Sequence, residues 1–147
     1  MSREALTDLY RKAVLANASD PFGKDLDIQP THEAEGHNPV CGDSVTVRFR
    51  VVDGTIEAVS FSGDSCAICT ASSAVLCRHL TGGDITAVEA GRDGFAASSR
   101  SGDSSEAPEL LQPLVRVRRY PARVECAMLP WDTAAKAVEG DQSPKSQ

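Results

Sequence analysis

Three short segments, far apart in the chain, each carry a cysteine at a point where a turn or a helix is expected to begin. They are residues 38–43 (NPVCGD), 64–69 (DSCAIC) and 123–131 (RVECAMLPW). Thiolates bind zinc tightly when three or four of them converge in tetrahedral geometry, and a carboxylate can complete the shell. Cys41 and Asp43 flank Gly42, which lets the backbone turn tightly enough to aim both side chains at one ion. The sequence therefore predicts a fold that assembles these segments into one metal site.

Composition narrows the class of protein. A chain of 147 residues fits one domain, which we place at residues 1–139, and the last residues, 140–147, lack large apolar side chains and are expected to form a disordered tail. The net charge of -6 argues against a nucleic-acid partner, because phosphate binding needs clustered basic residues. The one basic run, at 116–119, is interpreted as a solvated face rather than a docking patch for an acidic partner.

The expected cellular compartment is inferred from membrane and export signals and from cysteine usage. It has no apolar stretch long enough to cross a membrane, and its start has no apolar centre typical of a signal peptide. Five cysteines, an odd number, fit reduced thiols and metal binding better than a disulfide framework. We therefore expect a cytoplasmic protein with no membrane partner.

Periodicity predicts a helix and a β-hairpin in the first half. The segment 3–16 has near-helical spacing and is expected to end near Asn17, whereas 20–37 has little periodicity and supplies at most a short edge strand from its second half. Apolar residues alternate with polar ones over 45–51, and a second strand is expected at 55–62 after the turn signal Asp53-Gly54. Alternation in that second strand slips between Ala58 and Val59, which indicates a bulge. The helical stripe comprises Ala5, Leu6, Leu9, Ala13 and Leu15.

The second half is predicted to be helical. Asp64 or Ser65 is expected to cap a helix with Cys66 in its first turn, where the helix dipole favours the thiolate. Gly82-Gly83 ends this helix. Asp84 is expected to cap another one, which runs to about residue 97 and is followed by a mobile polar loop at 98–107.

A last helix is predicted to begin at Pro121, with Cys126 in its early turns facing the same space as Cys66. Pro130 is expected to kink or interrupt it. Its buried stripe is formed by Val124, Ala127 or Met128, Trp131, Ala135 and Val138.

The blocks NPVCGD, SCAICTASS and ARVECAMLPW resemble those of the SufU branch of the iron-sulfur cluster assembly proteins, whose other branch is the IscU scaffold. The resemblance runs from about residue 38 to 137. It implies an α+β domain in which helices cover a small antiparallel sheet of about three strands, with zinc at an exposed tip. The metal ligands implied by motif match are Cys41, Asp43, Cys66 and Cys126.

By the same resemblance the chain is expected to accept persulfide sulfur from a PLP-dependent cysteine desulfurase of the SufS type, which favours classing it as an enzyme, a zinc-dependent sulfurtransferase. Cys41 and Arg123 are the implied catalytic residues, Cys41 as the sulfur acceptor. A SufBCD-type scaffold is the implied downstream partner. Residues 18–23 (ASDPFG) depart from the histidine-aromatic and Pro-Arg-Asn pattern that SufU relatives often show.

The rival hypothesis is a scaffold that assembles a [2Fe-2S] cluster, or holds iron, on the same cysteines. Glu125, which stands where the IscU branch places a histidine, favours the SufU branch, as do Arg123 and the long stretch between Cys66 and Cys126. A closed structural zinc site is a third hypothesis, which the exchangeable carboxylate of Asp43 disfavours. Three further residues are not expected to bind the metal. Cys69 is disfavoured as a redox or zinc-knuckle partner of Cys66, Cys77 is interpreted as a core residue, and His37 as a polar turn residue.

Overall fold

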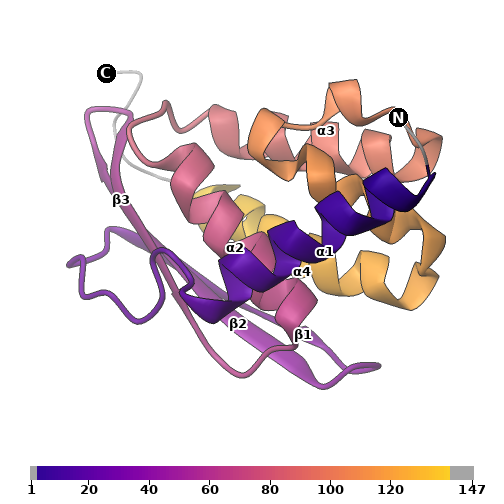
Figure 1. Ribbon diagram of the computed structural model, residues 1–147. Helices are drawn as coiled ribbons and strands as arrows, with labels where there is room; N and C mark the ends of the chain where they lie inside the picture. The colour runs from indigo at the N-terminus through magenta and orange to yellow at the C-terminus, as the bar shows by residue number, and fades with distance from the viewer. Residues whose placement is uncertain (1–2, 140–147) are drawn as a thin grey trace.

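The computed structural model of the protein describes residues 3–139. Its three strands form one antiparallel sheet in the order β1-β2-β3, and the helices gather on one face of it (Figure 1). This confirms the predicted α+β class. Residues 140–147, where a disordered tail is predicted, lie outside the described residues, and the single domain over 1–139 stays a prediction. In chain order the elements are α1 (Arg3–Ser19), β1 (His32–Asn38), β2 (Asp43–Val52), β3 (Thr55–Ser62), α2 (Ala67–Leu80), α3 (Ala87–Ser101), η1 (Ser104–Glu106), η2 (Glu109–Arg119) and α4 (Pro121–Glu139).

The predicted hairpin is present, and Asp53-Gly54 forms its turn, with positive φ at both residues. The bulge lies one step earlier than predicted: Arg50 pairs with Ala58 and Val51 with Ile56, which leaves Glu57 without a partner across the ladder. The edge strand expected in the second half of 20–37 is β1, which pairs antiparallel with β2.

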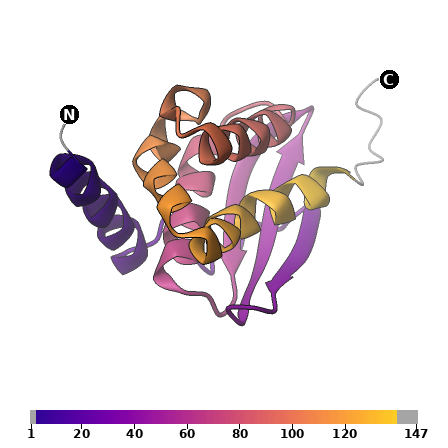
Figure 2. The ribbon, with the colours of Figure 1, turned by 90° about the vertical axis from the view of Figure 1, so that its right-hand side faces the viewer.

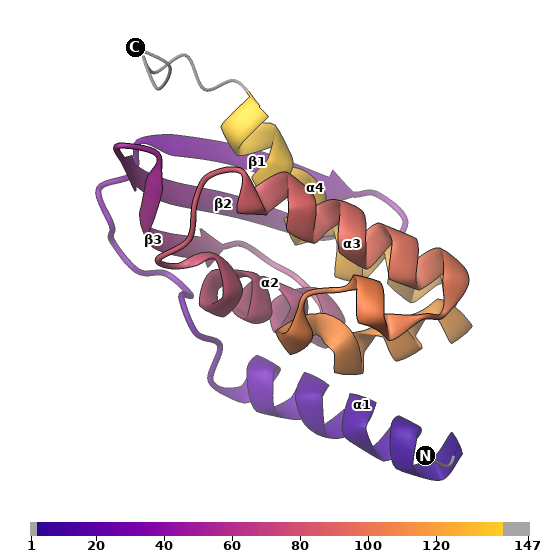
Figure 3. The ribbon, with the colours of Figure 1, turned by 90° about the horizontal axis from the view of Figure 1, so that it is seen from above.

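The helices form two layers on the sheet. Helices α2 and α4 contact the strands, and α4 runs across β1 and β2 (Figure 2). Helix α1 packs on α2 and η2, and α3 packs on α4, so both lie farther from the sheet (Figure 3). Gly91 permits the close approach of α3 to α4, because a Cβ there would collide with the ring of the fully buried Trp131.

The prediction of which residues form the buried stripe of α1 is partly wrong. Leu15 is 58% exposed, whereas Tyr10 and Val14, one turn apart, are buried. The helix therefore turns a different face to α2 and η2 than the count of apolar residues suggested, because an aromatic ring buries more area than a small aliphatic side chain. Leu15 is left at the surface.

The last helix begins at Pro121 as predicted and buries the expected stripe, but Pro130 does not interrupt it. Proline removes only the backbone hydrogen bond to the carbonyl of Cys126. Burial of Trp131 and Ala134, both fully inaccessible, offsets that loss by holding the next turn against its neighbours.

The prediction for residues 98–107 is wrong. Helix α3 continues to Ser101, where Gly102 at φ 81° ends it, and the 3-10 helices η1 and η2 follow. Asp84 does not cap α3 either; its carboxylate accepts hydrogen bonds from Thr86 in the turn before the helix. The physical reason for the ordered segment is the fully buried set Leu111, Leu114 and Val117, which anchors η2 in the core.

Candidate metal centre

The turn between β1 and β2 carries the first two candidate ligands. Gly42 has φ 77° and donates its N–H to the carbonyl of Asn38 at 2.8 Å, which closes the turn. This positive φ is the conformation for which glycine is suited. Cys41 is exposed at the tip, whereas Asp43, at the start of β2, is only 4% exposed.

The sequence predicts Cys66 in the first turn of α2, but the structure shows that Cys66 is the N-cap of this helix. Its sulfur accepts the N–H of Cys69 at 3.4 Å, and its own N–H donates to Oδ1 of Asp43 at 2.8 Å. The other oxygen, Oδ2, lies 3.7 Å from the sulfur of Cys66. The N-terminal N–H groups of α2 thus hold both a buried carboxylate and a thiol at one point.

Cys126 reaches the same point from α4. Its thiol is 3.2 Å from the sulfur of Cys41, and the ligand atoms of Cys41, Asp43 and Cys126 all lie within 4.8 Å of one another. Cys66 is not in that group of three, but it adjoins it through Asp43. Three segments distant in sequence therefore converge, as the sequence predicts.

Asn38 was missed as a member of this cluster. It is 6% exposed, its Nδ2 lies 3.8 Å from the sulfur of Cys126, and its Oδ1 accepts the N–H of Val40. The amide therefore links the turn to α4. The signal was available, since Asn38 opens the block NPVCGD.

The electrostatics of the cluster favour a cation. Burial raises the pKa of the Cys126 thiol above its usual range, and hydrogen bonds with Cys41 and Asp43 raise it further. Several groups that become anions on losing a proton are packed together, so full ionisation is unfavourable until positive charge joins them. A divalent metal ion supplies such charge.

Cys69 and Cys77 lie outside the candidate ligand set. Both are fully buried on α2, and burial raises the pKa of each thiol to about 12. They are therefore neutral core residues at physiological pH. The hydrogen bond between Cys69 and the sulfur of Cys66 comes from the backbone N–H of Cys69 and not from its buried thiol, which gives no support to a metal or redox couple.

These differences predict a labelling pattern. After metal removal by a chelator, iodoacetamide at about pH 8 should modify Cys41 and Cys66 rapidly, whereas Cys69 and Cys77 should react only on unfolding. A thiol of pKa about 12 is ionised in roughly one molecule in ten thousand at that pH, and the thiolate is the nucleophile. Peptide mass spectrometry after short exposure measures the order. Rapid native-state labelling of Cys69 would contradict the described burial.

The thiols open into a pocket of about 650 Å³ between α1 and the starts of α2 and α4. Arg123, in the first turn of α4, lines it, and its guanidinium lies 5.4 Å from the centre of the Tyr120 ring. The structure thus brings the predicted basic residue to the same pocket as Cys41, Cys66 and Cys126.

Two other hollows carry no thiol. One, of about 440 Å³ between β1 and α4, is lined by His37 and Glu125, so Glu125 faces away from the thiol pocket. His37 lies in β1 rather than in a turn, and its ring nitrogen Nε2 is hydrogen-bonded to Glu35 at 2.8 Å.

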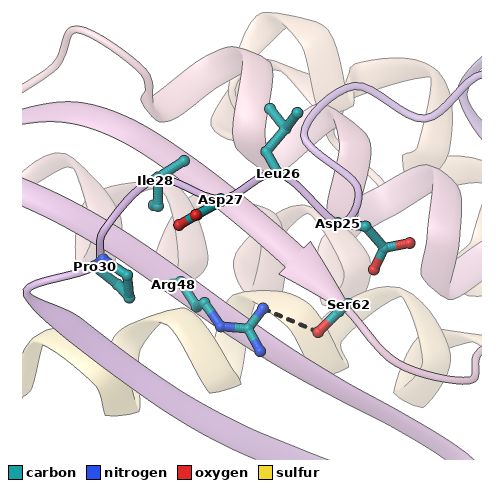
Figure 4. Close-up of a pocket in the computed structure, with 7 residues that line it drawn as sticks. All are labelled: Asp25, Leu26, Asp27, Ile28, Pro30, Arg48 and Ser62. Atoms are coloured by element: carbon teal, nitrogen blue, oxygen red, sulfur yellow. Dashed lines mark hydrogen bonds between the residues drawn. The ribbon is translucent and has the colours of Figure 1, made fainter.

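The other hollow, of about 340 Å³, lies where residues 25–30 cross the sheet on the face opposite the helices (Figure 4). There Arg48 donates to Ser62 and Glu33, which holds the sheet together rather than offering a free cation.

Residues 9–97 match the family described as NifU-like N terminal domain. The chain belongs to this family. Among relatives of this NifU-like protein, the zinc-dependent sulfurtransferase SufU of Bacillus subtilis is 24% identical over 139 residues, covering 93% of this chain and 94% of that protein. The iron-sulfur cluster assembly scaffold protein IscU of Thermotoga maritima is 30% identical over 138 residues, covering 92% and 96%. The resemblance to SufU and IscU is thereby confirmed at family level.

Solved structures agree on the fold. The N-terminal NifU-like protein of Brucella abortus aligns with a TM-score of 0.77 at 26% identity, covering 91% of this NifU-like chain and 95% of that one. A SufU protein of Fervidobacterium islandicum, described as a scaffold for the SUF system, aligns with a TM-score of 0.71 at 26% identity, covering 89% and 97%. Among the described residues, every helix is too short or too polar to span a bilayer.

Proposed function

We propose that this NifU-like protein is a zinc-dependent acceptor and carrier of persulfide sulfur in iron-sulfur cluster assembly. The observation that carries the proposal is the convergence of three thiols and a buried carboxylate beside an open pocket, with one thiol exposed on a turn. The proposed metal ligands are Cys41, Asp43, Cys66 and Cys126.

The donor set fits zinc. Zinc accepts thiolate and carboxylate oxygen together in tetrahedral sites, and it has no redox chemistry that would oxidise the thiols. When bound, zinc would keep the cysteines ionised at neutral pH and would hold them through exchangeable bonds. Asp43 is the one hard donor among soft sulfur donors, which makes its bond the natural point of exchange.

Cys41 is the proposed sulfur acceptor. It is exposed on a turn, whereas Cys126 is 2% exposed within α4, and Cys66, although it is exposed as well, is fixed at the N-cap of α2. Its thiolate attacks the outer sulfur of a persulfide, and the electron pair of the broken S–S bond stays with the donor cysteine as thiolate. Movement of Cys41 disturbs no core packing.

Arg123 is proposed to offset the negative charge of the centre. Three thiolates and a carboxylate around a dication leave a net charge near -2, and a guanidinium lining the same pocket lowers the energy of that charge. It is also placed to steer the anionic persulfide.

A protein donor suits the surface around Cys41. Val40 is 83% exposed beside it, and Leu15 and Tyr120, both lining the thiol pocket, are 58% and 43% exposed. Exposed apolar side chains grouped around a reactive thiol favour a protein partner. We propose a PLP-dependent cysteine desulfurase of the SufS type as the donor and a SufBCD-type scaffold downstream, in the cytoplasm, where thiols stay reduced.

The second candidate is a scaffold for a [2Fe-2S] cluster on the same cysteines. It is supported by the Thermotoga maritima relative named as an IscU scaffold, which shares 30% identity with this chain. The position of Glu125, outside the thiol pocket, supports the carrier instead, because Glu125 does not supply the fourth ligand from α4.

Metal content separates the two. Protein purified without added iron should contain about one zinc per chain, because three thiolates and a carboxylate satisfy a tetrahedral zinc ion. Elemental and sulfide analysis measures it. A brown protein with iron and stoichiometric sulfide would replace the carrier with the scaffold.

Asp43→Cys should bind zinc more tightly but stimulate the desulfurase less. A fourth thiolate should strengthen zinc retention against a chelator by about tenfold or more, while stimulation of the desulfurase falls to near the basal rate, because the exchangeable oxygen is gone. Chelator competition and desulfurase assays measure the two effects. Full stimulation by this variant would show that the carboxylate is not needed for exchange.

A further inference from the structure

The thiol pocket has features that a metal centre does not require. Its lining residues come from α1, α2, α4 and the flanking turns, and none of them is acidic. Its volume of about 650 Å³ is within the range that holds small organic ligands, which is roughly 300–1,000 Å³. The pocket lies beside the sulfur chemistry rather than within the ligand shell. The lining residues are Tyr10, Arg11, Val14, Leu15, Cys41, Cys66, Ala67, Ile68, Tyr120, Ala122, Arg123 and Cys126.

Two polar groups from α1 face this space without a role in the centre. Tyr10 is 8% exposed, and its buried hydroxyl has no hydrogen bond of good geometry among the described residues, although the guanidinium of Arg123 lies close to it. Burial raises the pKa of Tyr10, an effect larger than the lowering by the nearby Arg123. Arg11 is exposed and lines the same pocket. The pocket is thus lined by one neutral donor, Tyr10, and two cations, Arg11 and Arg123, which together suit an anionic group.

We propose that this pocket binds a low-molecular-weight thiol that bears a carboxylate, such as glutathione or cysteine, as the acceptor of the sulfur held on Cys41. Arg11 and Tyr10 bind the carboxylate, and the apolar wall of Val14 and Ile68 covers the carbon chain. The thiol end then faces Cys41. This inference rests on the proposed sulfur-carrier function and names the second substrate of the same site.

The transfer balances without an oxidant or a reductant. The acceptor thiolate attacks the terminal sulfur of the Cys41 persulfide, a new S–S bond forms, and the bond between Cys41 and that sulfur breaks. Its electron pair remains on Cys41 as thiolate. The proton of the persulfide leaves with the product, so that Cys41–S–SH and RS⁻ give Cys41–S⁻ and RS–SH.

The test begins with protein whose Cys41 has been loaded with persulfide sulfur by the desulfurase and cysteine. The desulfurase and the remaining cysteine are then removed. Failure of loading would refute the proposed function at this first step, before any acceptor is added. Loaded protein is then mixed with 3-mercaptopropionate, 2-mercaptoethanol or 2-mercaptoethylamine, which carry negative, no and positive charge. Rates are normalised to loaded sulfur and thiolate concentration. We expect the anionic thiol to react about tenfold faster than the neutral one, and the cationic thiol to be slowest.

Arg11→Gln should reduce that preference and leave only the part that Arg123 in the same pocket contributes, and Tyr10→Phe should lower it without loss of stability. Lys12→Gln is the matched control: it removes the adjacent positive charge, which does not line the pocket, and should keep the preference. Equal rates for the three thiols in wild-type protein, or an unchanged preference in Arg11→Gln, would overturn the proposal.

Binding is tested independently of activity with S-methylglutathione, which cannot attack a persulfide. Amide shifts in NMR spectra of the zinc-loaded wild-type protein should concentrate at Tyr10, Arg11, Ala67 and Ile68. Shifts absent at millimolar concentration, or confined to other surfaces, would contradict the site, and sulfur release only to a protein partner would assign the pocket to that partner.

Discussion

Replacing Cys126 by serine is expected to release zinc and to lower the melting temperature of the metal-loaded protein by roughly 10 °C. Zinc held at about 100 times its dissociation constant stabilises the folded state by about 2.7 kcal/mol, and that contribution disappears with the ligand. Cys126 is 2% exposed and touches both Cys41 and Asn38, so its loss also removes contacts that join α4 to the turn. Calorimetry with and without a chelator separates the metal's share from the packing.

Cys77→Ala is the matched control, because Cys77 is equally buried but lies outside the cluster. It should lower the melting temperature by the same amount with and without the chelator, and zinc should remain. If Cys126→Ser keeps its zinc while Cys69→Ser loses it, the assignment of ligands is wrong and the Cys66-x-x-Cys69 pair is the site.

Replacing Cys41 by alanine is expected to reduce stimulation of the desulfurase to the basal rate, even where zinc partly survives on Asp43, Cys66 and Cys126. The reason is positional: Cys41 is exposed on a turn, whereas Cys66, which is also exposed, caps α2 and Cys126 lies within α4, so that movement of either would disturb a helix. Steady-state sulfide release, together with zinc content of the same sample, measures both quantities. Stimulation near the wild-type level would transfer the acceptor role to Cys66 or Cys126.

The hairpin and the candidate site were predictable from the sequence for physical reasons. Alternation over 45–51 specifies one buried face, and Asp53-Gly54 suits a turn with two positive φ angles. The site follows from short blocks in which Cys41, Cys66 and Cys126 each stand next to a turn or a helix terminus. Such local signals can be read without the tertiary structure, because they depend only on residues that are neighbours in the sequence.

Other features depend on contacts that local patterns do not contain. The sequence predicts a loop at 98–107, because this polar run gives no sign of the buried residues Leu111, Leu114 and Val117 that follow it. Those three stand at every third position, a spacing that matches a 3-10 helix. The cap of α2 was placed one or two residues early, since Asp64, Ser65 and Cys66 can all accept a hydrogen bond and only the tertiary bond from Cys66 to Asp43 decides between them.

The pocket residues on α1 illustrate the same limit. Tyr10 and Arg11 stand at adjacent helix positions, and nothing in the chain from 3 to 16 indicates that they line the same pocket as the start of α4. Only the packing of α1 on α2 and η2 brings them to the thiols.

The central claim is that Cys41 receives sulfur at a zinc centre, and mass spectrometry by peptide tests it most directly. Zinc-loaded protein is incubated with the desulfurase and cysteine, alkylated and digested, and the added sulfur is located among the five cysteines. The account predicts a persulfide on the peptide containing Cys41, which disappears in Cys41→Ala and when zinc is removed. Sulfur found chiefly on Cys66, Cys69 or Cys126, with Cys41 unmodified, would contradict it.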